Sequence, residues 1–142
     1  MTDTTSYGPA ILDGMCRMLA AAGIGFYQGP DVAIPSGEVG IVPSALPSSP
    51  QRAISVTRYL DVPGDIAQNT TRVQVRSRVS QNPFDAEAVC DQIRSTFHGK
   101  THVQLGDYRF DRIRLFSHGP LGPDQNGFYE FSQNFDLHGN RY

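Results

Sequence analysis

Residues 72–79, RVQVRSRV, and residues 83–98, PFDAEAVCDQIRSTFH, decide the fold. The first stretch alternates between valine and polar side chains, which predicts a β-strand with one apolar face. The second stretch repeats apolar residues at helical spacing, which predicts an amphipathic helix. Asn82 suits the N-cap of that helix, and Pro83 suits its first position, where a missing N–H costs nothing. The centre of the predicted fold is therefore a strand that leads through a short polar turn into a helix.

Another amphipathic helix is predicted over about residues 9–22, because apolar side chains recur there at helical spacing. A short strand is expected at residues 24–27. Residues 28–51 then contain five prolines and three glycines, which exclude a regular helix. Only residues 38–42 could pair there as a short strand. A loop of this length is expected to be functional or ordered by a partner, with a mobile surface loop as the alternative.

Alternating polar and apolar residues predict further strands along the chain. These strands are expected at residues 53–60, 102–105, 108–117 and 128–137, with turns at 61–70 and 106–107 and a loop at 119–127. Consecutive strands with short turns favour an antiparallel or mixed sheet with two helices on one face. The chain of 142 residues is therefore predicted to form a single α+β domain, a two-layer sandwich with a long Pro/Gly-rich loop at about 28–51.

Composition narrows the class of protein. The net charge of −2 and the pI of about 6.0 argue against a free-standing nucleic-acid binder. The apolar stretches fall short of the roughly 20 residues that a membrane helix needs. The N-terminus lacks the basic start and apolar core of a signal peptide, so a soluble cytosolic protein is expected. Cys16 and Cys90 lie on separate predicted helices, which favours two buried free thiols over a disulfide or a metal pair.

Residues that would carry enzyme chemistry do not form a recognisable motif. His98, His102, His118 and His138 are scattered, and no glycine loop for phosphate or nucleophile elbow is present. Asp107 and Asp111 flank a predicted hairpin turn and are best explained as solvated turn residues. The sequence therefore predicts no catalytic, cofactor-binding or metal-binding residue.

Charge is segregated by strand, which is the most informative polar feature of the sequence. Alternation places each group of charges on one strand face. The residues concerned, candidates for a subunit interface or a lumen, are Arg72, Arg76, Arg78, Arg112, Arg114, Glu130 and Asp136. Three interpretations remain open. The face could be solvated and carry cross-strand pairs, it could join a basic stripe of one subunit to an acidic stripe of the next, or it could face DNA phosphates.

The layout of elements resembles the tail terminator and minor capsid (head–tail joining) proteins of long-tailed bacteriophages. Several segments between about Ile11 and Leu137 carry this resemblance. They are the apolar stripe Ile11-Leu12…Met15…Met18-Leu19, the Pro-rich segment leading to a strand that ends at Tyr59, the VQVRSR strand, and the helix pattern Ala86…Val89-Cys90…Ile93…Phe97…Gly99.

The resemblance implies a structural role in a virion. Such proteins form a ring, commonly of six subunits, at the head-proximal end of the tail tube, where they stop tube polymerisation and present the surface that joins the head. The implied partners are other copies of the chain, the tail tube protein and the head–tail connector, with non-specific contact to DNA passing through the ring. The resemblance implies that the protein has no enzyme activity, no cofactor and no membrane partner. It also implies assembly in the host cytoplasm. The loops at 28–51 and 118–127 are candidate contacts with the tube or connector.

Two alternatives stay open at this point. A helix on a curved sheet could enclose an apolar pocket, as in small α+β ligand-binding proteins or enzymes. The aromatic residues that would line it include Phe110, Phe116, Tyr129 and Phe131. The other alternative is a head-completion or connector adaptor, which only its binding partner would distinguish from a tail terminator.

Overall fold

The computed structural model describes residues 1–63 and 69–139 and has two helices and a six-stranded sheet. Along the chain the elements are α1 (Tyr7–Ala21), β1 (Gly40–Val42), β2 (Ala53–Pro63), β3 (Asn69–Arg78), α2 (Pro83–Phe97), β4 (Thr101–Leu105), β5 (Tyr108–Pro123) and β6 (Tyr129–Gly139). The strand order is β1-β2-β3-β6-β5-β4. Only β1 and β2 pair in parallel, so the sheet is mixed.

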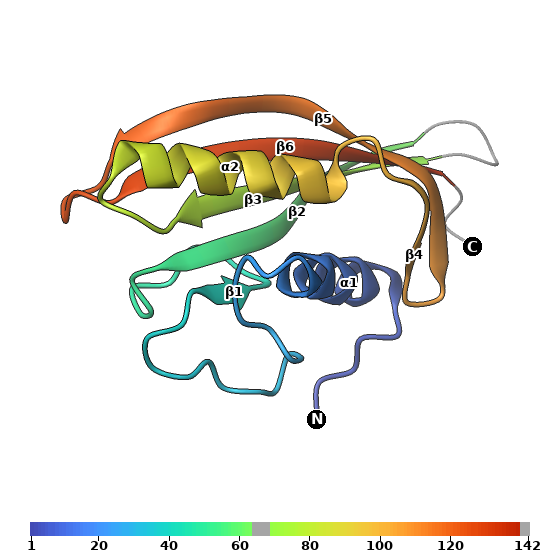
Figure 1. Cartoon of the computed structure of the whole chain (residues 1–142). Coiled ribbons are helices and arrows are strands. Elements are labelled where there is room, and N and C mark those ends of the chain that lie inside the picture. Colours follow the sequence, from blue (N-terminus) through green and yellow to red (C-terminus); the bar gives the residue numbers. More distant parts are fainter. Residues whose placement is uncertain (64–68, 140–142) are drawn as a thin grey trace.

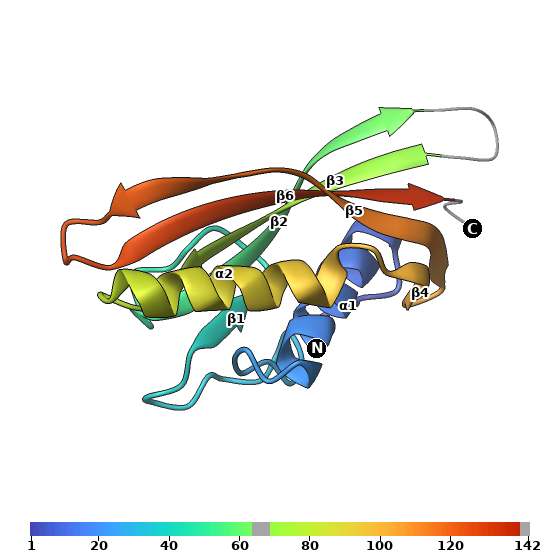
Figure 2. The ribbon, with the colours of Figure 1, turned by 45° about the horizontal axis from the view of Figure 1, so that its top comes forward.

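The sheet curls into a half-barrel, and both helices lie on its concave side (Figure 1). Figure 2 shows α2 running along β5, β6 and β3, with α1 beside the short strands β1 and β4. Both helices therefore cover one face of the sheet, and no helix in the described part of the chain covers the convex face. The predicted α+β architecture is confirmed.

Both helices form for the reasons that the sequence suggests. The Asn82 side chain accepts a hydrogen bond of 2.9 Å from the Phe84 amide, which satisfies one of the free N–H groups at the start of α2. The apolar stripes of the helices pack on the sheet, and Phe97 of α2 meets Phe135 of β6 edge to face at 5.2 Å. Cys16 and Cys90 are both free and buried, as predicted, and burial raises the pKa of the Cys16 thiol to about 12.

The prediction for residues 119–127 is wrong in its first half. Strand β5 continues to Pro123, because Gly119 pairs with Ser132 and Pro123 pairs with Tyr129. Two bulges, at Phe116 and Leu121, absorb the irregular backbone of this Gly- and Pro-rich stretch. The turn itself is short, and Asp124 closes it by accepting hydrogen bonds from the amides of Asn126 and Phe128.

Two other predicted boundaries also move. Residues 24–27 form no regular strand, since Phe26 makes only one isolated bridge, to Gly40. The turn predicted at 61–70 is wrong at both ends, because β2 runs to Pro63 and β3 begins at Asn69. Residues 64–68 of that predicted turn lie outside the described residues.

The Pro-rich segment at 28–51 is held by contacts within the chain. The Arg78 guanidinium donates hydrogen bonds to the carbonyls of Pro47, Pro50 and Gln51. At the other end of the segment, the Asp31 carboxylate accepts from the Thr2 amide at 2.7 Å and the Thr2 hydroxyl at 2.6 Å. These contacts anchor both ends of the segment to the rest of the chain.

Candidate interaction surface on the outer face of the sheet

The structure brings the predicted charged residues onto three neighbouring strands, β3, β6 and β5. Arg72 lies opposite Asp136, which in turn lies opposite Arg114, and Arg78 lies opposite Glu130. Alternation along each strand turns these side chains away from the helices, onto the convex side. We call this side the outer face. The basic and acidic stripes of the sequence are therefore adjacent rows of one surface.

Asp136 is the centre of this surface. Its Oδ1 accepts from Arg72 Nε at 3.0 Å, its Oδ2 lies 3.8 Å from an Arg114 nitrogen, and its side chain is only 3% exposed. The Arg72 guanidinium also covers the Phe116 ring at 4.1 Å. One nearly buried carboxylate is thus shared by two arginines, which leaves this cluster with excess positive charge.

The remaining rows of the outer face form a polar ladder. Arg76 pairs with Glu130 at 2.7 Å, and the Gln74 amide donates to Asn134 at 3.2 Å. Asn134 in turn donates to the Ser117 hydroxyl at 2.9 Å on β5. Such cross-strand pairs stabilise the sheet by fractions of a kcal/mol each. Both acidic residues proposed for an interface, Glu130 and Asp136, have their charge compensated within the same chain.

Arg78 has a different environment from the other candidates. It is only 8% exposed, and its guanidinium is occupied by the loop carbonyls of residues 47–51. Its role in this structure is to fasten the Pro-rich loop to the sheet.

Positive charge remains at the end of the outer face where β6 finishes. Arg112 is exposed and makes no ion pair with any residue in the described part of the chain, and Arg114 is half-exposed. The pKa of His138 is lowered, first by burial and then by Arg112, Arg114 and Arg72, against the opposing effect of Asp136. His138 is therefore neutral at pH 7. Its Nδ1 shares a hydrogen bond of 3.0 Å with the hydroxyl oxygen of Thr70, and the ring tautomer decides which of the two atoms is the donor.

Two exposed aromatic residues accompany these arginines. Tyr59 is 47% exposed and Phe116 is 50% exposed, and each sits at an irregularity in strand register. The bulge at Phe116, which alternation in the sequence does not show, turns this ring onto the outer face under Arg72. Arginine and aromatic side chains are the residue types enriched at protein interfaces.

The four aromatic residues proposed to enclose a pocket lie in different places. Phe110 is fully buried in the main core, whereas Phe131 packs under α2 with Tyr129. Phe116 lies on the outer face, on the other side of the sheet. The bulge in β5 and the packing of two separate clusters therefore keep these four residues from lining one cavity.

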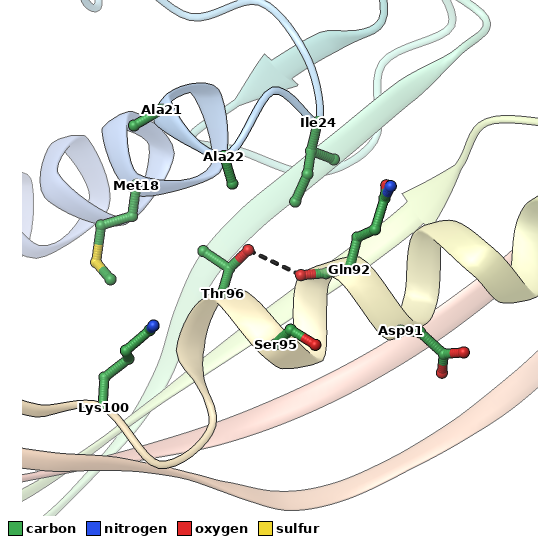
Figure 3. A pocket seen from close by; sticks show the side chains of 9 residues that line it. All are labelled: Met18, Ala21, Ala22, Ile24, Asp91, Gln92, Ser95, Thr96 and Lys100. Carbon is green, nitrogen blue, oxygen red and sulfur yellow. Dashed lines mark hydrogen bonds between the residues drawn. The ribbon is translucent and has the colours of Figure 1, made fainter.

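A groove does exist on the opposite side of the molecule, between the C-terminal ends of α1 and α2 (Figure 3). Its volume is about 630 Å³. The lining comes from Met18, Ala21, Ala22, Ile24, Asp91, Gln92, Ser95, Thr96 and Lys100. Asp91 and Lys100 are the charged residues of this lining and lie toward opposite ends in Figure 3. A smaller groove of about 460 Å³ shares Ile24 and continues along α2 to Asp85.

Residues 1–63 and 69–139 contain neither a candidate metal site nor a candidate membrane-spanning helix. No three His, Cys, Asp or Glu side chains gather closely enough to hold a metal ion. No helix in this part of the chain has the length and apolar character needed to cross a membrane.

Comparisons with known proteins place this fold in a family. The family model described as "Bacteriophage tail terminator protein" matches residues 20–141. Among solved structures, a chain of the "Virion of native gene transfer agent (GTA) particle" has the same fold, with a TM-score of 0.64 and 10% identity over 95% of this chain and 98% of that chain. A comparison with curated proteins finds no significant match. The chain therefore belongs to the bacteriophage tail terminator family and is a structural protein of a phage virion.

Proposed function

We propose that this protein is a tail terminator that forms a ring of six subunits at the head-proximal end of the phage tail. There it would stop polymerisation of the tail tube and present the surface that joins the head. The observation that carries this proposal is the family match over residues 20–141, which includes both faces of the sheet and α2. The likeness of fold to a chain of a gene transfer agent virion supports it.

The proposed action is mechanical and needs no catalysis. The ring would bind other copies of the chain, the tail tube protein and the head–tail connector, after assembly in the host cytoplasm. DNA would pass through its lumen with at most non-specific contact. The net charge of −2 fits this role, since a subunit without overall positive charge does not attract the phosphate backbone strongly.

Native mass spectrometry and assembly on purified tail tubes test the proposal. We expect a closed ring of six subunits, either in solution or on the tube end, and tubes that no longer elongate once the protein is added. A phage that lacks the protein should produce tails of excessive length.

Two results would contradict this function. One is a protein that never associates with itself or with tube ends. The other is binding to the connector alone with normal tail length in its absence, which would identify a head-completion adaptor instead.

A further inference from the structure

The exposed side of α2 differs in charge from the outer face of the sheet. Asp85, Glu87 and Asp91 are all exposed on the first part of this helix, and Arg94 is the cation that follows them. Phe84, at the start of α2, is 84% exposed. We call this surface, residues 84–95 of α2 with the adjoining groove, the helix face. It combines negative charge, an exposed aromatic ring and a recess.

The outer face has the complementary character. Four arginines (Arg72, Arg76, Arg112 and Arg114) share this face with two carboxylates, so it carries excess positive charge. The helix face carries three carboxylates against two cations, Arg94 and the Lys100 that lines the groove, so it carries excess negative charge. The two faces lie on opposite sides of the molecule, because α2 packs on the concave side of the sheet (Figure 1).

From this arrangement we infer that the outer face of one subunit docks on the helix face of the next, and that this contact builds the ring. The inference rests on the proposed function and names the surfaces that would meet. A symmetric contact would place arginines against arginines or carboxylates against carboxylates, which electrostatic repulsion opposes. A contact between opposite faces is heterologous, and repeating it closes a ring when the rotation between subunits divides a full turn.

Exposed aromatic residues on both surfaces supply the apolar part of the contact. Tyr59 and Phe116 project from the outer face, and Phe84 projects from the helix face. Small residues such as Ala21 and Ala22 line the groove beside α2, which leaves space for an inserted side chain (Figure 3). Buried aromatic anchors typically dominate the binding energy of an interface, while surrounding charges set its register.

A charge exchange tests the inference. The first variant, Glu87→Arg with Asp91→Arg, makes both faces basic. The second variant, Arg112→Glu with Arg114→Glu, makes both faces acidic and leaves Arg72 to pair with Asp136. We expect each variant alone to lose ring formation. An equimolar mixture should recover it, in rings where the two variants alternate and the number of subunits is even.

A control comes from the turn between β4 and β5. Asp107 is exposed there and belongs to neither face, so Asp107→Arg should leave ring formation unchanged. Circular dichroism and thermal unfolding check that every variant folds. If the second variant does not fold, Arg112→Glu alone replaces it, since Arg112 makes no ion pair with the described residues.

Native mass spectrometry and electron microscopy, in solution and on tail tubes, give the readout. Recovery of rings only in the mixture supports the inference. Rings formed by each folded variant alone would overturn it and leave the proposed function standing. A wild-type protein that forms no ring under either condition would overturn the proposed function, and the inference with it.

Discussion

Arg72 and Asp136 face each other across β3 and β6, and the arginine Nε donates to the aspartate Oδ1 over 3.0 Å. The carboxylate is almost completely shielded from water by its neighbours, although it lies on the face of the sheet that has no helix. Arg72 and Arg114 both lie beside it, and the Arg72 guanidinium also covers the ring of Phe116. This pair therefore organises the surface that we propose as one side of the subunit contact.

Replacing Asp136 by alanine should destabilise the protein by about 1–3 kcal/mol, because the half-buried Arg72 guanidinium loses its partner. Replacing both residues, as Arg72→Met with Asp136→Leu, should cost less than the single change, since no unpaired charge remains. Urea unfolding measures both values, with Arg109→Ala on the β4–β5 hairpin as the control. An Asp136→Ala variant as stable as the wild type would show that the pair contributes nothing.

Arg78 should fix the Pro-rich loop to the sheet. Its loss in Arg78→Ala leaves the carbonyls of Pro47, Pro50 and Gln51 without their donor, and we expect a cost of about 2–4 kcal/mol. Arg78→Lys should recover only part of this stability, because an ammonium group cannot reproduce the planar fork of donors. Hydrogen exchange at the amides of Ser48, Ser49, Gln51 and Arg52 should accelerate in Arg78→Ala and not in the exposed control Arg94→Ala. Equal exchange in both variants would contradict this role.

His138 should make stability depend on pH. Its pKa in the folded protein lies below the ordinary value of 6.5, chiefly because of burial, so the unfolded chain binds more protons as the pH falls below that value. Stability should therefore decline between about pH 7 and pH 5 more steeply in the wild type than in His138→Gln. Urea unfolding at several pH values gives the difference between the two proteins, which should be constant above about pH 7.5. Parallel curves across the whole range would show that His138 contributes no such linkage.

Gly14 should be intolerant of a side chain although it lies within α1. A Cβ atom there would come within 2.7 Å of Leu105 Cδ2 and 3.3 Å of the Leu105 Cα. Gly14→Ala gains about 1 kcal/mol of helix propensity, and overpacking costs about 1–3 kcal/mol, so we expect a net loss of stability. Gly119→Ala is the matched control, because a Cβ on Gly119 meets no atom within 4 Å. Stabilisation by Gly14→Ala would show that β4 can move away from α1.

The sequence by itself determined the two helices, most of the strands and the polarity of each strand face. These features depend on local periodicity and capping, which is why the Asn82 cap and the alternation at residues 72–79 predicted them correctly. The resemblance to tail terminators also came from these local patterns, and the family match over residues 20–141 confirms it.

Only the tertiary structure decided which charges meet. Strand order puts β6 between β3 and β5, so Asp136 and Glu130 are compensated by arginines of the same chain. The bulges that extend β5 and expose Phe116 depend on pairing with β6, which alternation in a single strand cannot show. The acidic helix face lies on the side of the molecule opposite the outer face because α2 packs on the concave side of the sheet. Pairing between distant segments fixes all three features, and that is the physical reason why the sequence alone left them open.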